Sequence, residues 1–328
     1  MNSPVFCRST AVFLIAAMLG GCSGFGRKPD WIDDPSSKYS ATTHLSAVGS
    51  ADERQVAADR AVGNIAKIFE VAVQESTLDF SSAEVRTAQG QQVTVNEQQV
   101  TRNVSIEAKQ VLEGVKVAEY WDSDVGRVYA LAILAKQPAA SRFRQSIVAQ
   151  DREVKDLINY ASAKADNPVS ALKALSRARD IQMARERVNK NLMVVADGKG
   201  IKGQYDIAEV NNLIRDSLSA LEVAIRAEDD TVQTELEQAL ASLGVQLVDK
   251  SNLVLRGDMD VAPVEKKQGW YWLRGSYELQ FEDNGVALAK KRWAIKVSAT
   301  DEAVLEKRAR DEINQNLPQY VYELLSSE

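Results

Sequence analysis

The residue with the clearest chemical role in this sequence is Cys22, which ends the segment Leu19-Gly20-Gly21-Cys22. A leucine, two residues without bulk and a cysteine form the pattern that a lipoprotein signal peptidase requires. The thiol receives a diacylglycerol, the peptidase cleaves before the cysteine, and the new amine accepts a third acyl chain. Each buried methylene of these chains contributes about 0.8 kcal/mol, so two or three chains hold a protein on a membrane essentially permanently. We therefore predict lipidation at Cys22 and expect no other cofactor.

The residues before this cysteine have the composition of a signal peptide. Arg8 is the only charged residue among them, and the apolar run at 11–19 is too short to span a membrane. The alternative is a buried helix that happens to end in Gly-Gly-Cys, which would require the positive flank and the cysteine to coincide. Ser23 stands where an aspartate would favour retention in the inner membrane of a Gram-negative cell. The sequence therefore predicts a signal peptide at 1–21, a tether at 22–28, and an outer-membrane anchor facing the periplasm.

Few other side chains offer catalytic chemistry. His44 is the only histidine, and Cys7 is the only cysteine besides Cys22. A lone histidine forms neither a metal cluster nor a Ser-His pair without partners, so we interpret His44 as structural. We find no Walker motif and no metal-ligand spacing. We therefore predict that the protein is not an enzyme. A hydrolase with two facing carboxylates stays open as an alternative, because carboxylate pairs are common.

The segment 198–203 reads Gly-Lys-Gly-Ile-Lys-Gly and satisfies the spacing of a nucleotide-binding loop. In such a loop the glycines let a pyrophosphate approach the start of a helix, and the motif requires a strand before it. Here the preceding residues 192–195 continue a helical pattern. We therefore interpret 198–203 as a turn between helices, with nucleotide binding as the alternative.

Two runs of charged residues also have alternative interpretations. The acidic run at 228–230 could coordinate calcium, but no loop of alternating oxygen ligands follows it. We interpret it as a helix end and cap. The basic run at 290–292 lies beside Trp293 and could bind RNA or lipid. We interpret it as charge that guards the exposed edge of a sheet.

The charge balance limits the partners of the protein. The chain has 40 basic and 46 acidic residues, which gives a formal net charge of −6. Such a surface repels nucleic acid and anionic headgroups. We therefore predict no nucleic-acid partner and a membrane contact through the lipid anchor. The expected partners are envelope proteins or peptidoglycan-associated machinery, and a homo-oligomer stays open.

Trp270, Tyr271 and Trp272 form the densest aromatic cluster of the chain. Adjacent residues of a strand point to opposite faces, so at most one side of this cluster belongs to a core. Tyr271 continues an alternating apolar series, whereas Trp272 shares its face with polar residues such as Arg274. Aromatic residues are enriched where proteins meet partners. We therefore predict that Trp272 contacts a partner or a glycan.

Three regions must position these residues, and together they predict an α+β fold. The first region, 29–137, is a small domain with a helix on an antiparallel sheet. Its expected elements are a strand at 44–49, helices at about 52–73 and 97–112, and a hairpin of strands at 115–121 and 127–134. Alanines along the first helix permit a close approach to the sheet. Trp31 opens the region, and we place it in the core rather than among lipid headgroups.

Three motifs of this region are shared with a known family. They are Pro29-Asp30-Trp31-Ile32 after the lipidation site, Ala47-Val48-Gly49-Ser50-Ala51 before an alanine-spaced helix, and an ending from Leu112-x-Gly114-Val115 through Tyr120-Trp121 to Val128-Tyr129-Ala130-Leu131-Ala132. Over about 29–136 the sequence therefore resembles the LPP20-type lipoproteins. The resemblance implies an envelope lipoprotein. Some members of the family are linked to flagella or motility and to surface antigenicity, and the family offers no catalytic residues to carry over.

The second region, 138–229, has a helical pattern throughout. We predict helices at 141–163 and 168–195, the latter with proline in its first turn. A third helix follows Asp206 and carries an apolar stripe to Ile225. The narrow stripes are typical of an antiparallel hairpin or small bundle. At 1.5 Å per residue a helix of roughly 28 residues extends about 40 Å, so we expect this region to act as a spacer.

The third region, 230–328, is predicted to be a second α+β domain. Its expected elements are a helix at 231–243, a short strand at 245–248, antiparallel strands at 253–264, 270–281 and 286–297, and a final helix from about residue 301. Asn284-Gly285 is a strong signal for a hairpin turn. In topology this region resembles the small module of periplasmic lipoproteins related to the TolB N-terminal and CsgG-like folds.

These observations predict a non-enzymatic outer-membrane lipoprotein that acts as a structural or interaction component of the cell envelope. The LPP20 resemblance points to flagellar or motility assembly. The resemblance of the third region points instead to a regulator of a peptidoglycan synthase or to a secretion accessory, and this alternative stays open.

Overall fold

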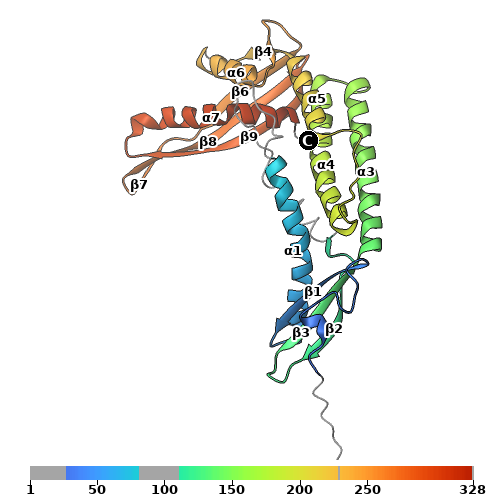
Figure 1. Cartoon of the computed structure of the whole chain (residues 1–328). Coiled ribbons are helices and arrows are strands. Elements are labelled where there is room, and N and C mark those ends of the chain that lie inside the picture. Colours follow the sequence, from blue (N-terminus) through green and yellow to red (C-terminus); the bar gives the residue numbers. More distant parts are fainter. Residues whose placement is uncertain (1–26, 81–110, 228–229, 327–328) are drawn as a thin grey trace, which may run out of the picture.

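The computed structural model describes residues 27–80, 111–227 and 230–326. These residues form two β-sheets that lie at opposite ends of a helical column (Figure 1). Helices and strands combine at each end, which confirms the predicted α+β class. None of the helices in these ranges is long and apolar enough to span a bilayer.

The N-terminal unit is a sheet covered by one long helix. Its elements are η1 (Asp30–Ile32), β1 (His44–Ala51), α1 (Arg54–Phe80), β2 (Lys116–Asp122) and β3 (Val128–Ala135). The strands are antiparallel in the order β1-β3-β2. The predicted strands are confirmed, and α1 continues beyond its predicted end near residue 73. The helix predicted at 97–112 lies almost entirely outside the described residues.

The central strand β3 of this N-terminal sheet is buried on both faces. On one face, Ala130 and Ala132 of β3 belong to the core that contains α1. On the other face, Leu131 and Ile133 pack with Trp31, which is only 5% exposed. The predicted core position of Trp31 is therefore confirmed.

The contact between α1 and the sheet is very close. Gly49 of β1 faces the helix backbone, and a Cβ added there would lie 2.2 Å from the amide nitrogen of Ala61. Ala57 and Ala61 are fully buried at this contact. Their small side chains let the helix approach the strand, as the alanine spacing predicted.

Long helices connect the two ends of the molecule. They are α3 (Lys136–Ala163), α4 (Pro168–Val195) and the shorter α5 (Ile207–Ser219). The first two form an antiparallel hairpin (Figure 1). The Asn167 side chain accepts a hydrogen bond from the Ser170 amide and so caps α4, which begins with Pro168 as predicted. At 1.5 Å per residue, the 28 residues of α4 extend about 42 Å.

The third predicted helix is shorter than expected. α5 ends at Ser219, and the apolar residues assigned to its last turn form strand β4 (Glu222–Arg226) instead. β4 pairs in parallel with β6 (Leu253–Val261) and buries Val223 completely. The β-branched side chains of Val223 and Ile225 suit a strand. The deciding contact is with a strand distant in sequence, which local periodicity cannot reveal.

The C-terminal unit is a mixed sheet with helices on one face. Besides β4 and β6 it contains α6 (Asp230–Ser242), β5 (Gln246–Leu247), β7 (Glu265–Lys267), β8 (Trp270–Asp283), β9 (Val286–Ala299), η3 (Glu302–Val304) and α7 (Leu305–Ser326). β6, β7 and β9 all pair with β8 in antiparallel fashion. The predicted antiparallel strands and the Asn284-Gly285 turn are confirmed. The sheet as a whole is mixed, because β4, which was not predicted as a strand, pairs in parallel with β5 and β6.

The ends of the α3–α4 hairpin are built into two different cores. Toward the N-terminal unit, Phe143 of α3 and Leu192 of α4 pack with α1 and β3. Toward the C-terminal unit, Val154 of α3 and Leu172 of α4 pack with α6, α7 and the C-terminal sheet. Each of the two helices thus belongs to both cores. The hairpin therefore holds the two sheets at a set distance and angle (Figure 1).

Candidate functional site

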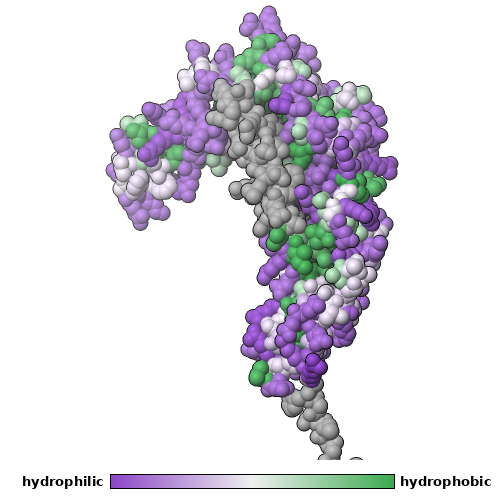
Figure 2. All heavy atoms as spheres, viewed as in Figure 1, coloured by the Kyte–Doolittle hydropathy of each residue, from purple (hydrophilic) through white to green (hydrophobic). Residues whose placement is uncertain are grey.

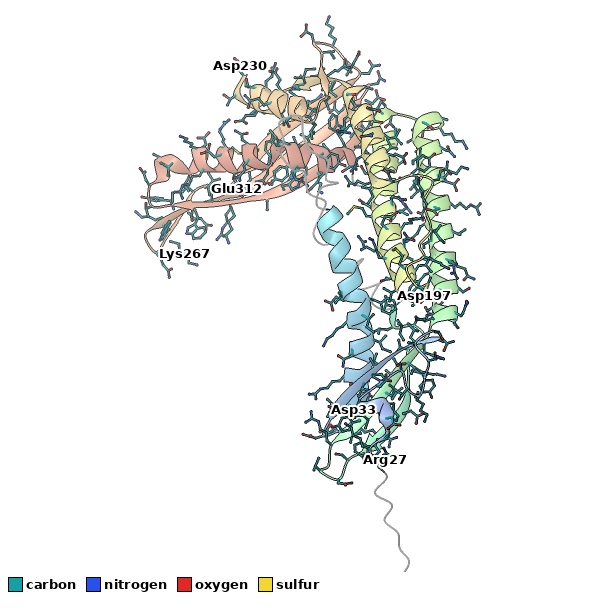
Figure 3. All side chains as sticks on the ribbon, in the orientation of Figure 1. Arg27, Asp33, Asp197, Asp230, Lys267 and Glu312 are labelled. Carbon is teal, nitrogen blue, oxygen red and sulfur yellow. The ribbon has the colours of Figure 1, made fainter. Side chains whose placement is uncertain are left out.

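The aromatic cluster predicted from sequence lies at the free end of the C-terminal unit. β7 and β8 form a hairpin whose turn residues, Gln268 and Gly269, have φ angles of 53° and 81°. A two-residue turn with two positive φ angles matches the twist of paired strands, and it places Trp270 directly after the turn. Lys267 marks this end in Figure 3, and Arg27 marks the opposite end of the molecule.

The aromatic rings divide between the two faces of the sheet, as predicted. Tyr271 packs against the C-terminal core, and its hydroxyl accepts a hydrogen bond from Lys266 Nζ at 2.9 Å. Trp270 and Trp272 share the opposite, outer face with the polar side chains of β8. Trp270 is 45% exposed, and Trp272 is half-buried.

Cations surround the two tryptophans on this outer face. The Arg274 guanidinium lies 5.9 Å from the centre of the Trp272 ring, and Lys296 Nζ lies 5.6 Å from it. Both distances fall within the range of cation–π contacts. Lys267 is paired with Trp270 across the hairpin. We name the five residues Lys267, Trp270, Trp272, Arg274 and Lys296 the tip patch. A partner contact at Trp272 stays a prediction.

Farther from the tip, the basic residues of the outer face are ion-paired with a carboxylate. Glu278 contacts Lys290 at 2.7 Å and Arg292 at 2.8 Å, and these hydrogen bonds hold the pKa of Glu278 below its ordinary value. On the other face, Lys291 contacts Glu323 of α7 at 2.8 Å. All three cations belong to the edge strand β9. The basic run therefore lies at a sheet edge, as its interpretation as guarding charge requires, and that role stays a prediction.

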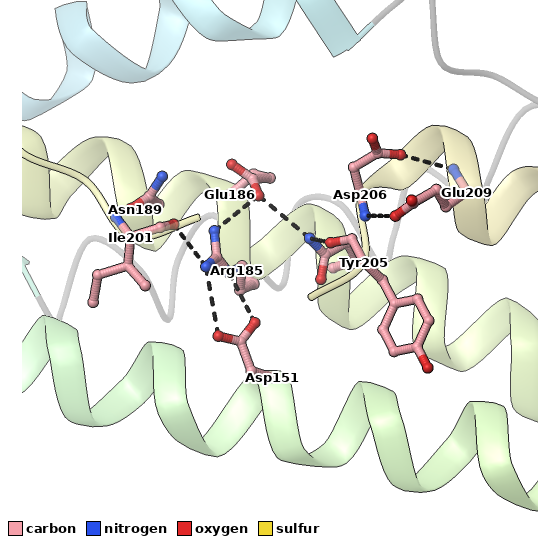
Figure 4. Close-up of polar contacts among 9 residues, drawn as sticks. Asp151, Arg185, Glu186, Asn189, Ile201, Tyr205, Asp206 and Glu209 are labelled. Carbon is pink, nitrogen blue, oxygen red and sulfur yellow. Dashed lines mark hydrogen bonds and ion pairs between the residues drawn. The ribbon is translucent and has the colours of Figure 1, made fainter. Parts of the chain in front are cut away.

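A buried polar network connects the helices in the middle of the helical column. We name its residues Asp151, Arg185, Glu186 and Ile201 the joint. Arg185 of α4 is fully buried. Its guanidinium donates to Asp151 of α3 (2.9 Å), to Glu186 (2.9 Å) and to the carbonyl of Ile201 (2.7 Å), in the loop before α5 (Figure 4). A buried charge is tolerated only when it is paired and its donors are satisfied. One side chain thus connects α3, α4 and the segment that leads into α5.

The glycine segment 198–203 belongs to this joint. It follows helix α4 rather than a strand, so the predicted turn between helices is confirmed. The Ile201 amide donates to the Asn189 side chain at 2.8 Å (Figure 4). Asp206 and Glu209 then form a capping box that starts α5. The polar groups at Ile201 are therefore engaged inside the protein.

A second buried arginine connects α4 to the C-terminal helix α7. Arg179 donates to the hydroxyl of Tyr322 at 2.7 Å, and both side chains are buried. Burial raises the pKa of the neighbouring Asp180, although the Arg179 charge opposes this shift. Sequence reasoning missed Arg179 and Arg185, because arginines in an amphipathic helix ordinarily face solvent.

The other predicted residues lie elsewhere. His44 begins β1, and its Nδ1 lies 2.9 Å from the hydroxyl of Thr43, far from the tip patch. Cys22 and residues 228–229 lie outside the described residues, and Asp230 begins α6. Within the described part of the chain, no three His, Cys, Asp or Glu side chains gather in a way that could hold a metal ion.

A small cavity on the covered face of the C-terminal sheet is not apparent from the sequence. Its volume is about 120 Å³, and its walls include Glu235 of α6, Arg310 of α7 and Tyr277 of β8. Tyr277 is 2% exposed, and its hydroxyl has no hydrogen-bond partner among the described residues. Burial raises the pKa of this hydroxyl, and the charge of Glu235 raises it further. Gly257 makes room for the hydroxyl, since an added Cβ would lie 2.5 Å from it.

Three solved structures of bacterial proteins are similar to this chain over different shares of its length. The minor lipoprotein of Acinetobacter baumannii is 18% identical over 32% of this chain and 90% of its own, with a TM-score of 0.27. The rare lipoprotein B of Shewanella oneidensis is 13% identical over 32% and 90%, with a TM-score of 0.23. A secreted protein of Helicobacter pylori is 11% identical over 87% and 98%, with a TM-score of 0.44. No curated protein matches the chain.

A family model gives the assignment. The model described as LPP20 lipoprotein matches residues 29–135, from the residue before η1 to the end of β3. This match confirms the resemblance that the sequence motifs indicated. Residues 29–135 of this chain therefore match the LPP20 lipoprotein family.

Proposed function

We propose that this chain is a non-enzymatic, lipid-anchored component of the outer membrane that presents its C-terminal unit to another component of the cell envelope. The sharing of both cores by the α3–α4 hairpin carries the proposal. A protein that only tethers a domain can use a flexible linker. Here the joint at Arg185 and the contact of Arg179 with α7 fix the orientation of the C-terminal unit as well.

The anchor is proposed at Cys22, with the protein facing the periplasm. The LPP20 lipoprotein match beginning at residue 29 supports an anchor just before it. The test is the intact mass and the membrane fractionation of Cys22→Ala beside Cys7→Ala, whose cysteine lies in the proposed signal peptide. We expect Cys22→Ala to lose the acyl mass and to leave the outer-membrane fraction, and Cys7→Ala to change neither. An unchanged Cys22→Ala would refute the anchor.

For the partner, we propose the assembly of flagellar or motility machinery first and a peptidoglycan synthase second. The first follows from the LPP20 match, and the second follows from the topology of the C-terminal unit. Crosslinking in the envelope followed by pull-down separates them. Flagellar ring components would support the first partner, and penicillin-binding proteins would support the second. Capture that is unaffected by Trp272→Ala would remove Trp272 from the contact.

A further inference from the structure

We propose that the tip patch binds the surface of an anionic lipid bilayer, as a membrane contact separate from the lipid anchor. The patch consists of Lys267, Trp270, Trp272, Arg274 and Lys296, and it lies at the end of the molecule opposite to Arg27 (Figure 3). This inference goes beyond the proposed function, because that function names a protein partner and this contact is with lipid.

The charge of the tip patch differs from that of the rest of the outer face. Nearer the middle of β8, the carboxylate of Glu278 is shared by two cations. At the tip, Lys267 and Lys296 form no ion pair with any described residue. Arg274 reaches only the exposed carboxylate of Glu265, at 3.9 Å. The tip patch therefore carries three cations, of which only Arg274 has a carboxylate partner among the described residues.

This local charge runs against the charge of the whole chain. The net charge of −6 predicts repulsion from anionic headgroups. Salt screens that repulsion over a Debye length of about 8 Å at physiological ionic strength. Because the tip projects from the end of a long hairpin, its own cations dominate the potential that a surface meets there. The tip patch of the C-terminal unit can therefore approach an anionic membrane that repels the rest of the protein.

The apolar residues of the tip suit the interfacial layer of a bilayer. Trp270 is 45% exposed and Val261, at the end of β6, is 38% exposed. Ala262 and Pro263 are exposed beside them. Tryptophan is favoured at headgroup level, where its ring is buried and its N–H stays wet. Lysine and arginine can keep their charge in water while their methylenes lie on apolar surface. The tip patch therefore combines the two residue types that membrane interfaces select.

The shape of the tip favours a bilayer over a peptide or a glycan. The patch lies on the end of a projecting hairpin, with hydrophobic residues set among hydrophilic ones (Figures 1 and 2). Peptides and small ligands are ordinarily bound in grooves or pockets. A projecting end can instead enter a fluid surface without a complementary groove.

The test uses residues 23–328, which lack Cys22 and contain every described residue. The protein is sedimented with vesicles of equal parts phosphatidylglycerol and phosphatidylcholine, and separately with phosphatidylcholine vesicles. We expect binding to the anionic vesicles that weakens in high salt. Loss of one cation near an anionic surface lowers binding about fivefold, so Lys267→Gln and Lys296→Gln should each show that loss. Trp270→Ala should lower binding about tenfold.

Lys290→Gln is the matched control, since it removes one charge from the same face at a residue that is ion-paired with Glu278. It should bind like the unmodified protein. The proposal is overturned by equal loss in Lys290→Gln and Lys296→Gln, by equal binding to neutral vesicles, or by no binding. Co-sedimentation of the protein with peptidoglycan sacculi but not with vesicles would also overturn the proposal. Because the cysteine is absent, these outcomes are independent of the anchor test at Cys22.

Discussion

The two sheets of this protein are covered to different extents. The N-terminal sheet has α1 on one face and the Trp31 cluster on the other, so its central strand β3 is almost completely buried. The C-terminal sheet has α6 and α7 on one face, while the outer face of β8 carries polar and half-exposed residues. One sheet is closed for stability, and the other keeps a face available for contact.

The open face of the C-terminal sheet shows how such a surface is kept soluble. Along most of its length, carboxylates and cations of neighbouring strands pair across it, as Glu278 does with Lys290. Paired charges on an exposed sheet discourage association with other strands. At the tip patch only Arg274 has such a partner, and aromatic rings lie among the cations. The tip patch, which we assign to binding, therefore lies on the face that the C-terminal sheet leaves open and the N-terminal sheet covers.

The largest effect is expected where α1 closes the N-terminal sheet. Gly49→Ala places a Cβ 2.2 Å from the Ala61 nitrogen, so the helix must move away from the strand. We expect the free energy of unfolding to fall by about 4 kcal/mol, as measured by urea denaturation. Gly63→Ala is the control, because its added Cβ meets nothing within 4 Å. It should gain about 0.5–1 kcal/mol from the better helix propensity of alanine. Equal stabilities would show that close packing does not hold this sheet.

The second-largest effect is expected at the joint, which lies in the helical column that connects the two sheets. Arg185→Met leaves Asp151 and the Ile201 carbonyl without their partner, and we expect a loss of about 3 kcal/mol in the free energy of unfolding. The control is Arg177→Gln, which breaks an exposed contact of 2.8 Å with Glu153 between the same two helices. Exposed pairs contribute little, so this variant should lose under about 1 kcal/mol.

The same joint also controls the angle between the two sheets. Spin labels at Val125→Cys and Val286→Cys, which are 88% and 66% exposed, report the distance between the two units. We expect a narrow distance distribution in the otherwise unmodified protein and a broad one with Arg185→Met. An equally narrow distribution in both proteins would mean that the apolar contacts at the two ends of the α3–α4 hairpin suffice to orient the C-terminal unit.

The third prediction tests the covered face of the C-terminal sheet, which contains the cavity beside Tyr277. Tyr277→Phe removes a buried hydroxyl that has no partner among the described residues, so we expect a gain of about 1 kcal/mol. Tyr322→Phe is the control, since it removes the acceptor of the buried Arg179 and should lose about 1–2 kcal/mol. A loss in Tyr277→Phe would show that the cavity beside it supplies the missing hydrogen bond.

The raised pKa of Tyr277 gives this prediction a pH dependence. The folded protein keeps the hydroxyl protonated, whereas the unfolded chain releases its proton above a pH of about 10. The contribution of Tyr277 is therefore fully present below that pH and is lost as the pH rises toward the folded pKa. The loss is about 1.4 kcal/mol per pH unit, and Tyr277→Phe should lack it. Identical alkaline unfolding of both proteins would contradict the raised pKa.

Much of the fold could be predicted from local patterns. Pro168 after an asparagine marks the start of α4, and Asn284-Gly285 marks the β8–β9 turn, because each of these signals acts within a few residues. Strict alternation in β8 likewise predicted that Trp272 would share a face with Arg274. The placement of the aromatic cluster on two faces could therefore be foreseen.

The parts that escaped prediction depend on distant contacts. β4 continues the apolar pattern of α5, and only its parallel pairing with β6 makes it a strand. β7 has the sequence Glu-Lys-Lys, which has no strand propensity, and it is ordered by its ladder with β8. Arg185 is buried because the loop before α5 supplies a carbonyl to its guanidinium. Trp270 is exposed because it lies directly after the turn of the β7–β8 hairpin, and the position of that turn is not apparent from composition.

The smallest effect is expected on the open face itself. Lys290→Gln removes one of two cations on Glu278, and the remaining contact with Arg292 at 2.8 Å keeps that carboxylate paired. We expect a change in the free energy of unfolding of under about 0.5 kcal/mol at neutral pH, smaller still in high salt.

The sign of this effect follows from the lowered pKa of Glu278, which Lys290 and Arg292 hold below the value of the unfolded chain. The stabilisation is present above the unfolded pKa of about 4.3 and disappears as the pH falls through the folded pKa. Urea denaturation of both proteins from neutral pH to about pH 3 measures this. Their stabilities should converge in acid. A loss as large as that of Arg185→Met would instead mean that the open face is as strongly stabilised by its charges as the joint, and the contrast between the two sheets would fail.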